Sequence, residues 1–223
     1  MAIAATVFDA YGTLLDVHSA MGRHAARIGP DWPRISQEWR QKHIEYTWVR
    51  SLAGPAQHRS FERLTDESLA VVAARNHITD AALLADLRAA YRSLHAYPEV
   101  PEMLAALRTA GMPRAILSNG DQGMLDIGVC AAGIADGLDA LLSAETVGVY
   151  KPDPRVYQIA VDHFGVPADR IAFMSSNPWD AFGAGAFGFQ VFWINRAGMP
   201  DEYDLGATAT VLSDLRALPA LLG

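Results

Sequence analysis

From Pro98 onward, the chain alternates short apolar segments with amphipathic segments of helical length. This alternation constrains the fold more than any other feature, because strands separated by helices form a parallel sheet that helices cover on both faces. The predicted strands cover residues 114–117, 141–143, 171–174 and 191–194. The predicted helices cover residues 102–110, 121–131 and 154–164. Gly111 and Gly165 end the first and the third of these helices.

A strand and a tight loop also open the chain. Residues 3–8 are apolar and partly β-branched, and they run directly into a loop at residues 9–13. The segment from about Val17 to Tyr97 shows no convincing strand. We therefore predict an α/β fold with two parts. These are a Rossmann-like parallel sheet core of residues 1–15 and 98–223, and an inserted helical cap of residues 16–97.

The cap segment contains three predicted helices. The first follows Pro33 and places Trp39, His43, Tyr46 and Arg50 on one face, and Arg40, Ile44 and Thr47 on the neighbouring face. The second covers residues 61–75. The third follows Thr79, a candidate N-cap residue. Its apolar face consists of Leu83, Leu84, Leu87, Tyr91 and Leu94.

Polar side chains follow four of the predicted strands. The four clusters are residues 9–13, Ser118-Asn119-Gly120, Lys151 and residues 175–180. In open parallel sheets, ligands bind beyond the carboxyl ends of the strands. Because reactive side chains gather at these strand ends, we predict one functional site there.

Charge and cysteine usage exclude several classes of partner. The net charge of −7 gives no electrostatic support to binding of nucleic acid or an anionic membrane. The single cysteine, Cys130, cannot form an internal disulfide, which is typical of a reducing cytoplasm. Its small apolar neighbours predict that it is buried. Without a basic N-terminal segment or an apolar run of roughly 20 residues, the chain is predicted to be cytoplasmic.

The four polar clusters resemble, in order, the four motifs of the haloacid dehalogenase superfamily. Asp9-Ala-Tyr11-Gly-Thr13-Leu14 is similar to the first motif, whose strand-end Asp is the nucleophile. Ser118-Asn119-Gly120 is similar to the second motif, Lys151-Pro152 to the third, and Ser175 to Asp180 to the fourth. The resemblance extends over the whole chain and implies a hydrolase.

Two positions depart from the phosphatases that make up most of this superfamily. Phosphatases resemble D-x-D-x-T at the first motif and G-D-x-x-x-D at the fourth, whereas this chain has Tyr11 and Ser176 at the corresponding acid positions. Magnesium needs hard oxygen ligands such as carboxylates, and phosphoryl transfer without that charge neutralisation would be poor. A leaving halide needs only donors. The resemblance therefore narrows to the L-2-haloacid dehalogenases (type II), with no metal and no cofactor.

The resemblance also implies a role for each cluster. Asp9 attacks C2 of a small 2-haloacid and forms an ester, and Lys151 keeps Asp9 ionised. Asn177 and Asp180 orient and deprotonate the water that opens the ester. Arg40, Asn119 and Trp179 contact the halide, and Ser118 binds the substrate carboxylate. The remaining catalytic candidates are Thr13, Tyr157 and Ser175, and the remaining substrate-binding candidates are Tyr11, Gln41, Ile44 and Phe61.

Alternatives remain for single residues and for the whole chain. Asp180 could cap the helix that follows it or act on Lys151 electrostatically, and Tyr157 could be a core residue. The alternative functions are a magnesium-dependent small-molecule phosphatase and a catalytically silent, interaction-only member of the superfamily. The resemblance further suggests a homodimer whose substrates are the haloacid and water.

One apparent motif is discounted. Residues 183–188 match the G-x-G-x-x-G pattern of dinucleotide-binding loops. That pattern requires a strand before it and a helix after it, whereas here the next strand starts within about three residues. We predict instead that these glycines allow a helix to pack closely on the sheet. The seven His residues show no ligand-like spacing, so no metal site is predicted.

Overall fold

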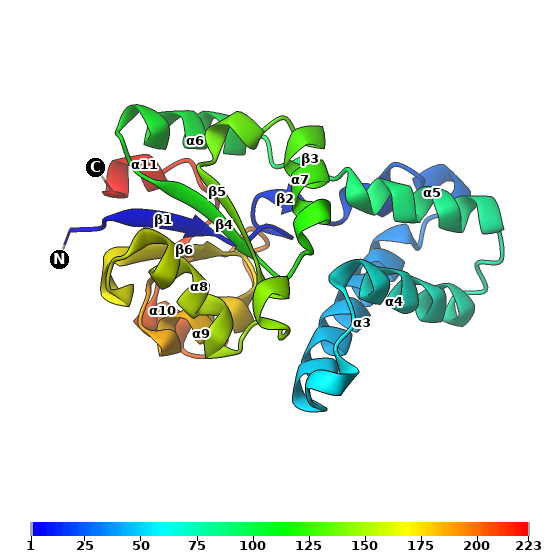
Figure 1. Cartoon of the computed structure of the whole chain (residues 1–223). Coiled ribbons are helices and arrows are strands. Elements are labelled where there is room, and N and C mark those ends of the chain that lie inside the picture. Colours follow the sequence, from blue (N-terminus) through cyan, green and yellow to red (C-terminus); the bar gives the residue numbers. More distant parts are fainter. Residues whose placement is uncertain (1, 223) are drawn as a thin grey trace.

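The computed structural model describes residues 2–222. At its centre is a parallel sheet in the order β5-β4-β1-β6-β7-β8 (Figure 1). Its strands are β1 (Ala5–Phe8), β4 (Arg114–Ser118), β5 (Ala140–Ser143), β6 (Ile171–Ser175), β7 (Gln190–Ile194) and β8 (Thr210–Leu212). The predicted α/β class is therefore confirmed. The edge strand β8 was not predicted, because it is only three residues long and two of them are exposed.

The first strand lies in the middle of the sheet because it can be buried on both faces. All four residues of β1 are buried, and the strand pairs in parallel with β4 on one side and β6 on the other. Continuous apolar strands of this kind are typical of parallel sheets covered on both faces. The carboxyl ends of β1, β4 and β6 consequently meet at one edge.

Helices cover both faces of the sheet. Figure 1 shows α6 (Val100–Thr109) with α11 (Leu218–Leu222) on one face, and α8 (Pro154–Phe164) with α9 (Pro178–Phe187) on the other. The other helices around the sheet are α7 (Gln122–Ala131) and α10 (Leu205–Thr208). Short 3₁₀ turns occur at Pro55–Gln57, Ala135–Gly137, Ala144–Val147 and Ala168–Arg170.

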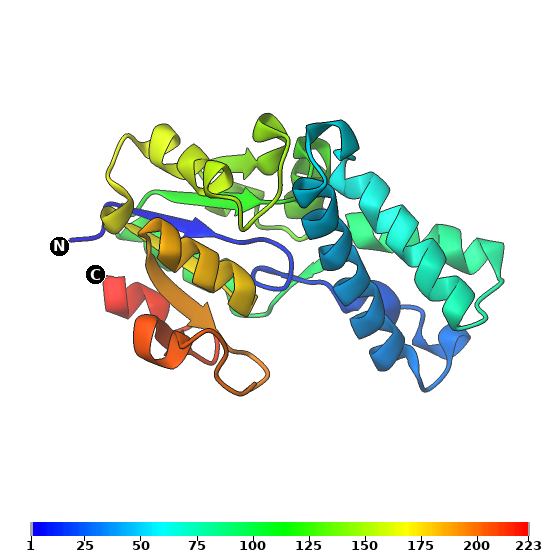
Figure 2. The same ribbon diagram turned by 90° about the horizontal axis from the view of Figure 1, so that it is seen from below.

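A helical block lies beside the edge where the strands end, as both views show (Figures 1 and 2). It consists of α1 (Ser19–Gly22), α2 (Ala25–Ile28), α3 (Trp32–Leu52), α4 (Phe61–Arg75) and α5 (Ala81–Arg92). The chain enters and leaves it through an antiparallel ribbon of β2 (Leu15–Asp16) and β3 (His95–Ala96). The expectation of no strand between Val17 and Tyr97 is thus wrong. Two residues per strand are too few to produce an alternating pattern in the sequence.

Cys130 also differs from its prediction, because its side chain is exposed. The buried face of α7 consists of Met124, Leu125, Gly128 and Val129. In a helix each residue is turned by about 100° from the previous one, so the position after Val129 lies beside this face. Apolar neighbours in the sequence were therefore a poor guide to burial here.

The N-cap of α5 is Asp80 rather than the expected Thr79. The Asp80 carboxylate accepts hydrogen bonds from the backbone N–H groups of Ala82 (2.9 Å) and Leu83 (3.0 Å). These bonds lower the pKa of Asp80 below its ordinary value, the bond from Leu83 contributing most. Asp and Thr are both good N-cap residues, so the sequence alone did not decide between two adjacent ones.

Replacing Asp80 with Ala should lower the urea midpoint of unfolding, because two helix N–H groups lose their acceptor and Arg27 loses a partner at 2.9 Å. The loss should be complete above pH 3.8, the ordinary pKa, and should shrink as the pH falls through the lowered pKa and the wild-type carboxyl is protonated. Thr79→Ala is the matched control and should leave the midpoint unchanged. Equal midpoints for the two variants at pH 7 would show that Asp80 does not cap the helix.

Candidate active site

The carboxylate of Asp9 lies just beyond the end of β1 and is held by three donors. Its Oδ1 accepts from Lys151 Nζ (3.1 Å), and its Oδ2 accepts from Thr13 Oγ1 (3.0 Å) and Asn177 Nδ2 (2.8 Å). The backbone N–H of Asp9 donates to Met174 O (2.9 Å), which continues the pairing of β1 with β6. The sheet therefore fixes the backbone of this residue, and three side chains fix the direction of its carboxylate.

Lys151 lies between two carboxylates. Its Nζ is 3.1 Å from Asp9 Oδ1 and 2.9 Å from Asp180 Oδ2, and its side chain is fully buried. The backbone N–H of Lys151 donates to Asn119 Oδ1 (2.9 Å), which ties this loop to the loop after β4. Buried charges require compensating partners, and here one ammonium contacts two carboxylates, each of which also accepts from uncharged donors.

Asp180 is fully buried and is surrounded by donors. Its Oδ2 accepts from Lys151 Nζ and Ser175 Oγ (3.0 Å), and its Oδ1 accepts from the hydroxyl of Tyr157 (2.8 Å). Burial raises the pKa of Asp180, while the charge of Lys151 acts in the opposite direction. Burial, followed by the nearby charge of Asp180, also raises the pKa of Tyr157 well above its ordinary value.

Gly183 allows α9 to approach this buried group. A Cβ atom at Gly183 would lie 2.6 Å from both Pro152 Cβ and the Tyr157 hydroxyl oxygen, which is closer than real Cβ contacts. At Gly185 the nearest atom would be Val191 Cγ2 at an ordinary 3.6 Å. The close approach predicted for these glycines therefore occurs at Gly183, but it is made to α8 and Pro152 rather than to the sheet.

A small cavity separates the sheet edge from the helical block, and we call it the inner cavity. Its volume is about 10 Å³, roughly the room that one water molecule needs. Its lining comes from the loops after β1 and β4 and from α3, α4 and α9. The lining residues are Asp9, Tyr11, Arg40, Ile44, Thr47, Phe61, Ser118, Asn119 and Trp179.

Arg40 brings a positive charge to the inner cavity from α3. Its Nη2 donates to the backbone oxygen of Tyr11 (2.8 Å) and to Asn177 Oδ1 (3.3 Å). Asn177 therefore bridges Arg40 and Asp9. Within residues 2–222, no carboxylate forms a salt bridge with Arg40. The arrangement places an arginine without a paired carboxylate beside a buried Asp, which suits an anionic ligand or leaving group.

The loop after β4 supplies polar groups to the opposite wall. Asn119 Oδ1 is held by the backbone N–H of Lys151, so the Nδ2 of the same amide is the group left to donate to a ligand. Ser118 Oγ accepts from the backbone N–H of Gly120 (3.1 Å). A Cβ at Gly120 would lie 2.9 Å from the ring of Tyr11. The glycine therefore allows the loop after β4 to contact the ring of Tyr11.

The structure brings the predicted site residues together, with one at the margin. Gln41 is exposed on α3 and does not line the inner cavity, but it lines a neighbouring cleft together with Arg40 and Ile44. Thr47 does line the inner cavity, although it was not among the candidates. The helical spacing of Arg40, Ile44 and Thr47 carried that signal, because the three share one face. The ring of Tyr91, also unpredicted, stacks on Tyr11 with ring centroids 5.8 Å apart.

Asp121 connects the loop after β4 to the helical block. Its two carboxylate oxygens accept from the backbone N–H groups of Phe61 (2.9 Å) and Glu62 (2.8 Å), at the start of α4. A negative charge at a helix N-terminus is favourable. The contact fixes the end of α4 from which Phe61 reaches the inner cavity. This contact was not predicted from the sequence, because its partners are about sixty residues apart.

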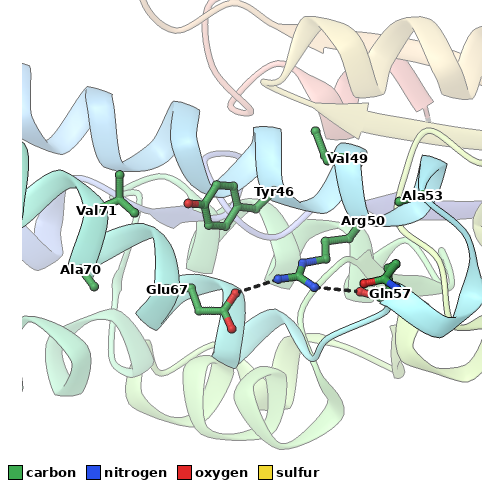
Figure 3. Close-up of a pocket in the computed structure, with 8 residues that line it drawn as sticks. All are labelled: Tyr46, Val49, Arg50, Ala53, Gln57, Glu67, Ala70 and Val71. Atoms are coloured by element: carbon green, nitrogen blue, oxygen red, sulfur yellow. Dashed lines mark hydrogen bonds and ion pairs between the residues drawn. The ribbon is translucent and has the colours of Figure 1, made fainter.

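Among the larger hollows outside the inner cavity, two adjoin α3. One, of about 620 Å³, lies between α3 and α4 and is crossed by the Arg50–Glu67 ion pair (3.3 Å) (Figure 3). It contains none of the predicted site residues. The other, of about 860 Å³, we call the outer cleft. It adjoins the inner cavity, since Arg40, Ile44 and Trp179 line both, and it extends to the residues after β6 and β7.

Within residues 2–222, no three His, Cys, Asp or Glu side chains form a group that could hold a metal ion. In the same part of the chain, no helix is both long and apolar enough to cross a membrane.

Comparisons with known proteins agree with the motif resemblance. The family model of the haloacid dehalogenase-like hydrolases matches residues 3–188. The (S)-2-haloacid dehalogenase 4A of Burkholderia cepacia is 45% identical over 221 residues, which are 99% of this chain and 95% of that protein. A crystal structure of a dehalogenase superposes with a TM-score of 0.95 at 44% identity, covering 99% of this chain and 97% of the other. The L-2-haloacid dehalogenase of Xanthobacter autotrophicus with covalently bound chloropropionic acid gives 0.89 at 34% identity, covering 99% and 98%.

Proposed function

The chain belongs to the family of haloacid dehalogenase-like hydrolases, and on that premise we propose that it hydrolyses small L-2-haloacids to D-2-hydroxy acids. The observation that carries this proposal is the environment of Asp9. A carboxylate held by Lys151 lines a cavity together with Arg40, which has no paired carboxylate within residues 2–222. An arginine suits a leaving halide, and two relatives that match 99% of this chain are named (S)-2-haloacid dehalogenases.

In the first half-reaction, a carboxylate oxygen of Asp9 attacks C2 of the haloacid from the side opposite the halogen. The new C–O bond forms as the carbon–halogen bond breaks, so C2 is inverted and halide is released. Lys151, Thr13 and Asn177 hold the nucleophile in one orientation. Such positioning can supply roughly 7–11 kcal/mol of a barrier. The product of this step is an ester of Asp9.

Substrate binding uses the other residues of the inner cavity. Arg40, the Nδ2 of Asn119 and the ring of Trp179 contact the halide, and Ser118 with nearby backbone amides binds the carboxylate. Tyr11, Ile44 and Phe61 form the apolar wall. The cavity has room for about one water molecule and a 2-haloacid is larger, so its side chains must move when substrate binds.

In the second half-reaction, water attacks the carbonyl carbon of the Asp9 ester. The bond between that carbon and the substrate-bearing oxygen breaks, and the 2-hydroxy acid leaves with the original oxygen of Asp9. Asn177 donates to Asp9 directly and so lies where it can orient the water. Asp180 is the proposed base, which its raised pKa supports. Its three donors equally support the alternative that it positions Lys151.

The phosphatase alternative has less support. At the two positions where phosphatases carry acids, this chain has Tyr11 and Ser176. The ring of Tyr11 packs against the ring of Phe61. Neither residue supplies the carboxylate that magnesium favours as a ligand.

We propose three further properties on weaker support. Residues 16–97 act as a cap over the catalytic core, which their position at the strand ends supports (Figure 2). The chain acts as a homodimer. The family resemblance supports this, and so do the exposed apolar side chains of Val49 and Leu52 on α3. It acts in the cytoplasm without nucleic acid or membrane partners, in keeping with one free cysteine and a net charge of −7.

The proposed function is tested by product release from chloro-, bromo- and fluoroacids of the L configuration and from phosphate monoesters. We expect halide and a D-2-hydroxy acid from at least one L-2-haloacid, at the same rate with excess EDTA or added magnesium. The D-haloacids with the same halogens are the control for the geometry of in-line attack on C2. Phosphate release that depends on magnesium, without halide release, would instead establish the phosphatase.

Arg40→Ala should lose activity much more than stability. Removing a preorganised donor to a developing negative charge typically slows a reaction by about a hundred- to a thousand-fold. Arg40→Lys should recover only part of the rate, because an ammonium does not reproduce the planar guanidinium. The measurements are steady-state halide release and the urea midpoint of each variant. Near-normal turnover by a folded Arg40→Ala protein would remove this residue from the reaction.

Asp180→Asn separates the two proposed roles of this carboxylate. If Asp180 is the base, the variant should release about one equivalent of halide and accumulate the ester, which mass spectrometry detects as an adduct on Asp9. If it only positions Lys151, the first displacement should slow as well and no adduct should accumulate. Tyr157→Phe, which removes one donor to Asp180, is the control for altered packing. Circular dichroism of both variants checks that they fold.

A further inference from the structure

His43 is a buried titratable side chain that the proposed reaction does not use. It lies on α3, one helical turn beyond Arg40, and only 1% of its surface is exposed. Its ring packs against the ring of Phe61, with ring centroids 4.2 Å apart. Arg40 and Phe61 both line the inner cavity, whereas His43 is not among its lining residues. His43 therefore belongs to the layer of side chains behind the cavity wall.

The two ring nitrogens of His43 face different partners. Nε2 lies 3.3 Å from Thr65 Oγ1, and Nδ1 lies 3.4 Å from the hydroxyl oxygen of Tyr91. The hydroxyl of Thr65 already donates its one hydrogen to Phe61 O at 2.9 Å, so it can only accept from His43. The hydrogen of the neutral imidazole must then be on Nε2. Nδ1 is left as an acceptor, and the hydroxyl of Tyr91 donates to it.

The surroundings of His43 keep its ring uncharged. Burial, followed by the charge of Arg40, lowers the pKa of His43 from its ordinary 6.5 to about 3, whereas the backbone oxygen of Phe61 acts in the opposite direction. Nδ1 is therefore free to accept at neutral pH. Phe61 O can only accept, and it is the acceptor of Thr65, so it favours a hydrogen on the nitrogen that faces Thr65.

These bonds form a network with a single direction, which we call the His43 network. Tyr91 donates to His43, His43 donates to Thr65, and Thr65 donates to Phe61 O. The network joins three helices of the helical block, α5, α3 and α4. Each hydrogen in it has one place, so the orientation of each member depends on the others.

Tyr91 links the His43 network to the candidate site. Its ring stacks on Tyr11, which lines the inner cavity, with ring centroids 5.8 Å apart and planes inclined by 12°. Because the hydroxyl hydrogen points to His43, the oxygen presents its lone pairs to other donors. Arg40 is such a donor. Burial raises the pKa of Tyr91, while the charge of Arg40 and its contact with the hydroxyl act in the opposite direction.

The acceptors around Arg40 orient its guanidinium without neutralising it. They are Tyr11 O (2.8 Å), Asn177 Oδ1 (3.3 Å) and the hydroxyl of Tyr91. A neutral acceptor fixes the direction of a guanidinium, whereas a carboxylate would also compensate its charge. The charge of Arg40 thus remains for an anion in the inner cavity. The Tyr91 acceptor depends on His43, because a hydroxyl without an acceptor for its hydrogen is free to turn.

We propose that His43 is a positioning residue for dehalogenation: as the neutral Nε2–H tautomer, it orients the hydroxyl oxygen of Tyr91 toward Arg40 and so holds the guanidinium for the leaving halide. This role rests on the proposed function. The His43 network does not, and it can be observed in the resting protein. Replacing His43 should therefore slow halide release more than it weakens substrate binding.

Nitrogen-15 NMR of the labelled full chain tests the His43 network directly. The signals of His43 are assigned by their loss in His43→Gln. We expect a protonated Nε2 and an unprotonated Nδ1 from about pH 8 to about pH 5, because the pKa of His43 is lowered to about 3. Free histidine is the reference, since its ring takes up a proton within this range. A hydrogen on Nδ1 of His43 at neutral pH would overturn the proposal.

Two substitutions of His43 separate positioning from packing. Phe keeps an aromatic ring against Phe61 but makes neither hydrogen bond, whereas Gln loses the ring but carries both an acceptor and a donor. We expect kcat for halide release to fall roughly tenfold in His43→Phe, as for one lost hydrogen bond to a charged group, with little change in KM. His43→Gln should keep most of the wild-type kcat. A packing role predicts the opposite order, so a kcat of His43→Phe that equals or exceeds that of His43→Gln would contradict the proposal.

Tyr91→Phe tests the same link with a smaller change, since it removes only the hydroxyl. It should lower kcat by a similar factor, and adding His43→Phe to it should lower kcat no further, because both act through one contact. Ser68→Ala is the control. It removes another buried hydroxyl of the helical block, which accepts from Trp39 Nε1 (3.1 Å), and should lower the urea midpoint without changing kcat. Wild-type kcat in a folded Tyr91→Phe protein would refute the link to Arg40.

Failure of the proposed function gives a different result from failure of this inference. If the wild type releases no halide from any haloacid, the proposed function and the role of His43 in it are both wrong. If the wild type releases halide and the folded His43→Phe protein is as fast, only the role of His43 is wrong.

Discussion

The contact on which this site depends is the buried ammonium of Lys151 between the carboxylates of Asp9 and Asp180. Removing charges from water is costly, and removing one member of a buried ionic group leaves the others uncompensated. Asp9 follows β1, Lys151 lies in the loop before α8, and Asp180 lies in the first turn of α9, so this ionic group joins three separate segments of the chain. The same ammonium orients the nucleophile. A buried ionic group is weak evidence for a stabilising role. Its role here is to orient the carboxylate of Asp9.

Much of the fold was predictable because it follows local rules. The strands at the centre of the sheet are continuous apolar runs, and helices such as α4 and α8 begin and end where the sequence indicated. The exceptions are weaker local signals. The strand β3 is two residues long and depends on its pairing with β2. Two predictions failed by one helix position: Cys130 is exposed beside the buried face of α7, and the N-cap of α5 is Asp80 instead of Thr79. A shift of one residue decides which face of a helix a side chain occupies.

The candidate site was predictable to a different degree. The strand-end residues followed from the rule for parallel sheets, whereas the position of Arg40 came only from the family resemblance. Contacts between the helical block and the sheet were invisible, since partners such as Asp121 and Phe61 are distant in sequence. The outer cleft was not foreseen for the same reason. Its lining residues come from α3, from the residues after β6, and from β7 and the turn that follows it, among others. Only the folded chain brings them together.

The bond from Asp121 to the start of α4 has a consequence for protein engineering. Helix α4 belongs to the segment between residues 16 and 97, but part of its N-terminal capping comes from the loop after β4. A chimera that took this segment from a relative would therefore inherit a helix whose cap is encoded elsewhere in the gene. Transplants that carry the matching loop residue should assemble more readily than transplants of the segment alone. An exchanged segment should therefore include the loop after β4 together with the helices of residues 16–97.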